Sequence, residues 1–243
     1  MLLKVLGCGD AFGNGERYNT AFLLTHEEEH VLLDCGTSTL FRLKEEGVEL
    51  EKISTIVLSH FHGDHFGGVP FFLIASLFEQ ERKNPLRIIG PPGVQERVLA
   101  LQEIMYPGTA KELETLSIDF IEYDERRTLE VGEISLQAYA VKHSLQSRPH
   151  GYKLNWGEKI VSFSGDTAMC ENLFELANEA DLFICECNFL WGENFGHLSY
   201  QELFQVKDRL SCKQLYLSHM NDEVLNAPSL AIKRLFTGQE ISL

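Results

Sequence analysis

Apolar residues come in short runs along the 243-residue chain, separated by glycines and charged residues, and most runs have the length of one strand. In the first half, this pattern predicts strands over Leu2–Leu6, Thr20–Thr25, His30–Asp34, Ile53–Ser59, Leu86–Ile89 and Ser117–Tyr123. Helices are predicted over Ser38–Glu46, Gly67–Arg82 and Val94–Met105. A proline in the first turn, as at Pro70, is compatible with the second of these helices.

The second half repeats this order of strands followed by helices. Strands are predicted over Ile134–Val141, Gly151–Leu154, Lys159–Ser164, Leu182–Cys185 and Gln214–Ser218. Helices are predicted over Glu171–Asn178, Ser199–Asp208 and Ala227–Leu235. Because no linker or low-complexity segment interrupts the pattern, we expect one α/β domain over residues 1–243. Two strand-rich halves favour two sheets packed together between outer helices.

The segment Ser59–Gly68 reads Ser-His-Phe-His-Gly-Asp-His-Phe-Gly-Gly and follows an apolar run that ends at Leu58. Three imidazoles and a carboxylate buried in a core would each need a partner. A metal bound on the loop at the carboxyl end of a buried strand satisfies all of them.

The spacing within this loop suits two neighbouring binding points. In extended backbone, His60 and His62 point to the same side, so both can bind one ion. Gly63 lets the chain turn and aim Asp64 and His65 at an adjacent point. The loop therefore predicts two ions a few ångströms apart that share a bridging carboxylate.

More metal-capable side chains follow predicted strands elsewhere in the chain. His143, Asp166 and His219 each come shortly after an apolar run, and His197 directly precedes a predicted helix. Strands that end at one edge of an α/β sheet gather such side chains into one site. Imidazole and carboxylate ligands favour Zn²⁺, with Mn²⁺ or Fe²⁺ as alternatives.

Other histidines and the cysteines fit structural roles better. His26 and His30 flank three glutamates at an expected hairpin tip, and His150 lies beside a proline in an expected loop. The six cysteines lack Cys-x-x-Cys spacing, which favours free thiols. Cys185 and Cys187 could place both sulfurs on one face of a strand, but no second pair completes a tetrahedral site.

Composition and net charge restrict the molecules that the protein can bind. The formal net charge of −15 opposes binding to nucleic acid in general, which requires a basic surface. No apolar run approaches the length of a membrane span, and the first residues lack the pattern of a secretion signal. We therefore expect a cytoplasmic protein with a small-molecule substrate and no membrane partner.

The H-x-H-x-D-H loop, His143, the Ser-Gly-Asp-Thr turn and the terminal Leu-Ser-His together resemble the metallo-β-lactamase superfamily over nearly the whole chain. The resemblance implies a four-layer αββα sandwich. It also implies one metal held by His60, His62 and His143 and a second held by Asp64, His65 and His219, with Asp166 bridging the two.

Within that superfamily, the chain is most similar to the ribonuclease Z-type phosphodiesterases. Motifs that carry this similarity are Leu-Gly-Cys-Gly-Asp-Ala, Gly-Pro-Pro-Gly, Glu-Cys-Asn-Phe and Gly-His-Leu-Ser. The similarity implies that Glu186 positions His197 to protonate a leaving oxygen. The carboxylate of Asp64 would both bind metal and accept a proton from the attacking water.

These features favour hydrolysis of a small, acyclic or cyclic phosphodiester. A carboxylic ester, thioester or lactone is the alternative, because the same metal site serves both reactions. Processing of tRNA 3′ ends is disfavoured, since the interval between His143 and Asp166 is too short for a tRNA-binding arm. Related enzymes are commonly homodimers, and Phe66, Phe71, Phe72 and Phe78 could serve either an interface or ordinary core packing.

Overall fold

The computed structural model describes residues 1–193 and 196–243, and in this part of the chain the strands form two mixed sheets of seven strands each. In order across the first sheet, the strands are β14 (Glu240–Ser242), β1 (Leu2–Gly7), β2 (Ala21–His26), β3 (Glu29–Leu33), β4 (Ile53–Val57), β5 (Leu86–Gly90) and β6 (Ile118–Glu122). Across the second sheet, they are β13 (Lys233–Arg234), β12 (Leu215–Ser218), β11 (Leu182–Glu186), β10 (Lys159–Phe163), β9 (His150–Trp156), β8 (Ile134–Ala140) and β7 (Thr128–Val131).

Helices cover the outer faces of the two sheets. Those of the first half are α1 (Thr39–Glu45), α2 (Gly63–Phe66), α3 (Val69–Phe78), α4 (Val94–Met105) and α5 (Ala110–Leu113). Those of the second half are α6 (Asn172–Ala177), α7 (Tyr200–Val206) and α8 (Asp222–Asn226). Short 3₁₀ turns occur at η1 (Asn14–Glu16), η2 (Leu50–Lys52), η3 (Leu145–Ser147) and η4 (Lys207–Arg209). No helix within residues 1–193 and 196–243 combines the length and apolar character needed to cross a bilayer.

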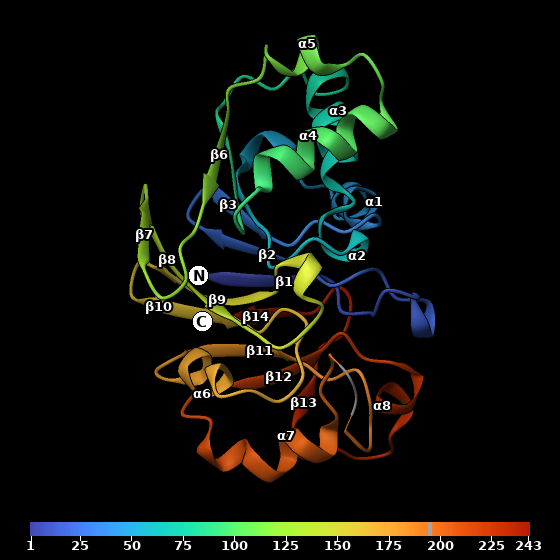
Figure 1. Cartoon of the computed structure of the whole chain (residues 1–243), viewed down its shortest axis with the longest axis vertical. Coiled ribbons are helices and arrows are strands. Elements are labelled where there is room, and N and C mark those ends of the chain that lie inside the picture. Colours follow the sequence, from blue (N-terminus) through green and yellow to red (C-terminus); the bar gives the residue numbers. More distant parts are fainter. Residues whose placement is uncertain (194–195) are drawn as a thin grey trace.

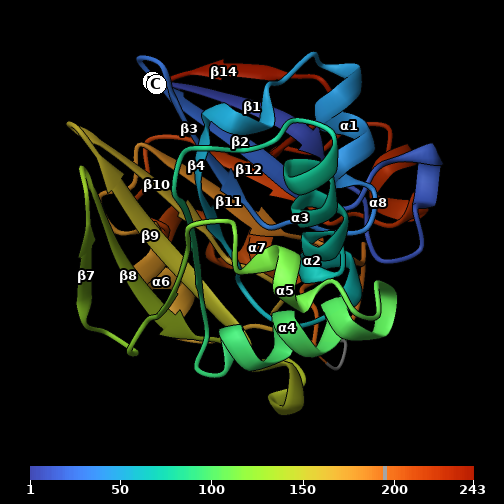
Figure 2. The ribbon, with the colours of Figure 1, turned by 90° about the horizontal axis from the view of Figure 1, so that it is seen from above.

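The layers follow from strands that bury both of their faces. In β2, Phe22 and Leu24 join the core between the two sheets, whereas Ala21 and Leu23 belong to the core under the helices of the first half. Figures 1 and 2 show α1, α3 and α4 over the first sheet, and Figure 1 shows α6 and α7 beyond the second. This order of layers confirms the expected αββα sandwich.

Parallel pairing directs several strand ends toward one edge. Strands β3 to β6 run parallel in the first sheet, and β10 to β13 run parallel in the second. The loops that follow β4, β10, β11 and β12 therefore leave from carboxyl ends, where ligand sites of α/β sheets form. Each of these loops carries a residue that the sequence singled out.

Two helix predictions were wrong in extent or place. The helix expected over Gly67–Arg82 is shorter at both ends: it is α3, which begins after Gly67 and Gly68 and ends at Phe78. The helix expected over Ala227–Leu235 does not form, and β13 occupies part of that segment. A helix forms earlier instead, where the Asn221 side chain accepts a hydrogen bond from the Val224 amide and caps α8.

Candidate functional site

The histidine-rich loop leaves β4 and turns into the short helix α2. His62 is the N-cap residue of α2, with extended backbone, and Asp64 and His65 lie in the first turn. His60 and His65 are fully buried, while His62 and Asp64 are partly buried. The loop thus holds its four ligand-type side chains on a rigid strand end and a helical turn.

Close backbone packing anchors α2 against the turn that follows β3. The Cys35 amide donates to the His65 carbonyl at 2.7 Å, and the Gly68 amide donates to the Cys35 carbonyl at 2.8 Å. A Cβ atom on Gly68 would lie 2.0 Å from the Gly36 carbonyl oxygen. Glycine at the end of the histidine-rich segment is therefore required for this approach.

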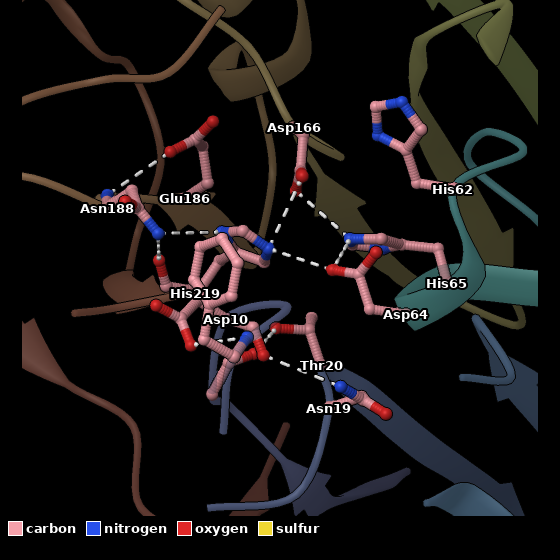
Figure 3. Close-up of polar contacts among 12 residues, drawn as sticks. Asp10, Asn19, Thr20, His62, Asp64, His65, Asp166, Glu186, Asn188 and His219 are labelled. Carbon is pink, nitrogen blue, oxygen red and sulfur yellow. Dashed lines mark hydrogen bonds and ion pairs between the residues drawn. The ribbon is translucent and has the colours of Figure 1, made fainter. Parts of the chain in front are cut away.

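Three other strand ends bring the remaining ligand-type residues to the same place. Asp166 follows β10 and His219 follows β12, and both are 2% exposed. His143 lies three residues after β8, on a loop bound to the Asp166 loop by a hydrogen bond from the Ala168 amide to the Lys142 carbonyl at 2.7 Å. Figure 3 shows Asp166 between His219 and His65.

The side chains form two groups that share Asp166, and the ligand atoms of each group lie within 4.8 Å of one another. The first group contains His60, His62, His143 and Asp166, and the second contains Asp64, His65, Asp166 and His219. These are the memberships that the family resemblance implied. The metal assignment itself stays a prediction.

In the first group, the ring nitrogens of three histidines face one another. His62 Nδ1 lies 3.2 Å from His60 Nε2 and 3.0 Å from His143 Nε2. Asp166 Oδ2 lies 3.8 Å from His60 Nε2. A neutral His62 can place only one hydrogen on Nδ1, which cannot serve the facing nitrogens of both His60 and His143, and a cation at this point satisfies all three imidazoles.

In the second group, carboxylates and imidazoles alternate. Asp64 Oδ2 lies 3.2 Å from His65 Nε2 and 3.3 Å from His219 Nε2. Asp166 lies 3.3 Å from both imidazoles, through Oδ1 to His65 and Oδ2 to His219. The buried atoms His65 Nε2 and Asp166 Oδ1 nevertheless have no hydrogen-bond partner among the residues that the structure describes. Orphaned buried atoms aimed at one point fit a divalent cation.

Charge and burial oppose each other in this cluster. Burial lowers the pKa of His60 well below its ordinary value. Burial acts in the same direction on His65, but Asp166 and Asp64 outweigh it and raise the pKa of His65 well above that value. Burial would raise the pKa of Asp166, yet His219 and His65 hold it well below the usual range. The carboxylates are therefore ionised and available as ligands.

Contacts from outside the two groups orient the ligands. Asp34 is completely buried, accepts hydrogen bonds from the Ser59 amide and hydroxyl, and contacts His65 Nδ1 at 2.7 Å. The Asn188 amide group donates to the His219 carbonyl at 3.1 Å. Neither Asp34 nor Asn188 was predicted from the sequence to support the site. A signal was present for Asp34, because it directly follows a buried strand, in Asp-Cys-Gly.

His197 lies beside both groups and is held by a buried carboxylate. Its ring lies 4.7 Å from the ring of His143 and is stacked at 5.4 Å on that of His219. His197 Nδ1 contacts Glu186 Oε1 at 2.9 Å. Burial would lower the pKa of His197, but Glu186 outweighs it and raises that pKa to about 9.

Glu186 also fixes the backbone around the site. The amides of Thr167, Asn188 and Leu198 donate to its carboxylate at 2.6, 3.2 and 3.3 Å. Thr167 follows Asp166, which the two groups share, so one carboxylate connects the Asp166 loop to the loop that carries His197. Glu186 can therefore set the position of His197 relative to the two groups.

The remaining histidines and cysteines lie outside these groups. His26 packs against Trp156, and His30 Nδ1 contacts the Thr25 hydroxyl at 3.0 Å. His150 begins β9, contacts the Arg148 carbonyl through Nδ1 and packs on Tyr123. Free thiols are found at all six cysteines, which include the buried pair Cys185 and Cys187.

An apolar groove lies beside the histidine-rich loop, at α2. It has a volume of about 640 Å³, and its walls include Gly63, Phe66, Phe71, Phe41 and Met105. Met105, the last residue of α4, is the point where this groove meets the loop that leads to α5.

Comparisons with known proteins agree with this fold. The family model described as "Anti-Pycsar protein Apyc1" matches residues 1–239. A ribonuclease Z from Agathobacter rectalis is 27% identical, over 92% of this chain and 88% of its own length. The metallo-β-lactamase fold protein YhfI from Bacillus subtilis superposes with a TM-score of 0.79 at 19% identity, over 99% of both chains. The short form of human tRNase Z gives 0.80 at 21%, over 100% of this chain and 99% of its own.

Proposed function

Because the chain belongs to the Anti-Pycsar protein Apyc1 family, we propose that it is a dinuclear-metal phosphodiesterase that cleaves a small, acyclic or cyclic phosphodiester. The protein is a metal-dependent hydrolase of the metallo-β-lactamase fold, and its substrate is the new element of the proposal. Two Zn²⁺ ions are proposed for the groups that share Asp166, with Mn²⁺ or Fe²⁺ as alternatives.

One observation carries the proposal: His197, held at Nδ1 by the buried carboxylate of Glu186, lies beside both candidate metal groups. The pKa of about 9 keeps His197 charged at neutral pH, and its Nδ1 is engaged by Glu186. The proton on Nε2 is therefore the one available to a leaving oxygen. Phosphodiesters with alkoxide leaving groups need such a proton most, because an alkoxide is a strong base.

Each site residue has a proposed role. When bound, the divalent ions would neutralise charge on the phosphoryl oxygens and lower the pKa of water. His60, His62 and His143 would hold one ion, and Asp64, His65 and His219 the other, with Asp166 between them. Asp64 would also accept a proton from the attacking water. Glu186 would hold His197 in the protonated state.

A substrate panel tests the reaction class. Purified, zinc-loaded protein is offered bis(p-nitrophenyl) phosphate, cyclic nucleotides, thioesters and lactones. We expect turnover of the phosphodiesters, and elemental analysis should give close to two metal ions per chain. Preference for thioesters or lactones would favour the carboxylic ester alternative. Metal content below one ion per chain, with no gain of activity on adding metal, would refute the dinuclear site.

We also propose a homodimer formed through α1, α3 and α4. Phe41, Phe78 and Ile104 are 58%, 62% and 77% exposed, on α1, α3 and α4, and Phe41 borders the apolar groove. Phe72 is fully buried and belongs to ordinary core packing. Light scattering at micromolar concentration should give twice the mass of one chain.

Residues 1–243 are proposed to form one domain, because the core between the sheets draws side chains from both halves. A cytoplasmic location is proposed from the six free thiols.

A further inference from the structure

We propose that Gly196 is a positioning residue that fixes the candidate metal ligand His143 and ties it to the proton donor His197. His143 Nδ1 lies 2.6 Å from the Gly196 carbonyl oxygen. A carbonyl can only accept, so Nδ1 carries the proton and the lone pair of His143 lies on Nε2. That lone pair faces the first group, 3.0 Å from His62 Nδ1.

The glycine is required for this contact. Gly196 has φ of 82°, in the left-handed region, and a Cβ atom there would lie 2.8 Å from His143 Nδ1. The backbone after Gly196 cannot move away freely, because Glu186 holds the His197 side chain and the Leu198 amide. A side chain at position 196 would therefore displace the His143 ring.

The contact also couples two parts of the site. The carbonyl that His143 binds belongs to the same peptide unit as the His197 nitrogen. Any shift of this peptide moves the carbonyl and the start of the proton donor together. An ordered His143 thereby fixes the position of His197, and the reverse holds as well.

Gly192 provides a matched control for Gly196. Its φ is 83°, so alanine there meets the same left-handed backbone, but no atom of the described residues lies within 4 Å of the Cβ position. In the contacts of the added Cβ with the described residues, Gly192→Ala and Gly196→Ala differ by the contact with His143. Zinc affinity of each variant and of the wild type is measured by competition with a chelator.

We expect Gly192→Ala to bind zinc as the wild type does. Gly196→Ala should bind the ion of the first group about 10–100-fold more weakly, the usual effect of losing a contact that orients a ligand. The ion of the second group should remain. Equal affinities in both variants, or equal losses in both, would overturn the inference, since the second outcome would assign the effect to backbone strain.

A spectroscopic measurement on the wild type keeps the inference testable if Gly196→Ala does not fold. In zinc-loaded protein with ¹⁵N-labelled histidine, His143 should show a protonated, slowly exchanging Nδ1. A His143 that binds zinc through Nδ1 would refute the role of Gly196.

The inference rests on the proposed function, because it treats the two groups as metal ligands. The measurements distinguish a failure of the proposed function from a failure of the role given to Gly196. A wild type that binds no zinc refutes both, whereas a wild type that binds zinc as tightly as Gly196→Ala refutes only the role of Gly196. At saturating zinc, Gly196→Ala should still lose more activity on alkyl than on nitrophenyl phosphodiesters, and an equal loss would contradict the coupling to His197.

Discussion

Replacement of His197 by alanine should slow the cleavage of substrates with poor leaving groups and spare those with good ones. The pKa of about 9 means that only about 1% of His197 is unprotonated at pH 7, so nearly every molecule carries the acid. General acid catalysis contributes about 10²–10⁴-fold. At about 1.4 kcal/mol for each factor of ten, the barrier on an alkyl phosphodiester should rise by about 3–5 kcal/mol.

Metal binding should survive the replacement. His197 belongs to neither group that shares Asp166. Its removal leaves Glu186 buried without its cationic partner, and burial already raises the pKa of this carboxyl group. We expect Glu186 to take up a proton rather than remain charged. The Thr167 amide can still donate to it, so the bridging loop should keep its place.

The assay compares one substrate of each kind across three proteins. Wild type, His197→Ala and His150→Ala are loaded with zinc, their metal content is checked, and kcat/KM is measured on an alkyl and a nitrophenyl phosphodiester. His150→Ala removes a histidine that lies outside the candidate metal groups and should behave as the wild type on both substrates. Equal loss for His197→Ala on both substrates would refute the acid role and leave binding or structural support as its function.

Three further predictions concern the support of the site, the stability of the fold and the substrate. Asp34→Asn keeps the side-chain shape and tolerates φ of 58°, but it removes the negative charge and replaces one acceptor oxygen with an NH2 group. Ser59 and His65 can then no longer all donate to it, so zinc affinity should fall about 10–100-fold in a chelator competition. Arg82 is buried and donates to four backbone carbonyls, so Arg82→Leu should cost about 3 kcal/mol and lower Tm by roughly 6–12 °C, whereas Arg127→Leu, at an exposed position, should leave Tm unchanged. At low salt, precursor tRNA should be cleaved far more slowly than a small diester, because the net charge is −15 and the interval 143–166 holds only η3, β9 and β10. Comparable cleavage rates for the two substrates would instead support tRNA processing as the function.

Most strands could be predicted because both of their faces are buried and their apolar runs are unbroken. The helix Val94–Met105 was predicted to the residue, since an αL glycine precedes it and amphipathic spacing fills it. The strands β7, β13 and β14 were not predicted. They have only four, two and three residues, and pairing with a neighbouring strand of the sheet stabilises them more than a hydrophobic pattern of their own. β14 pairs with β1, at the other end of the chain.

The ligand-type residues of the site were predictable for a local reason, since each follows an apolar strand or opens a helix. The residues that hold these side chains in place could not be predicted from the sequence. Asp34 and His65 are 31 residues apart in sequence, and Gly196 and His143 are 53 apart. A backbone carbonyl has no signature in the sequence, and a buried aspartate after a strand also fits a turn. The parallel pairing of β3 with β4 brings Asp34 to His65, and two loops of the second sheet bring Gly196 to His143.

Backbone strain connects the site with its chemistry. Asp34, Gly165, Gly196 and His219 all have positive φ, between 52° and 82°, and each lies in a loop of the site. For the two residues that carry a side chain, this conformation costs about 1–3 kcal/mol each. At a strand end, a left-handed residue reverses the chain within one step. His219 can therefore face the second group while the backbone turns toward α8. The chain keeps these unfavourable conformations where the ligand-type side chains converge, as expected for a site selected for binding rather than for stability.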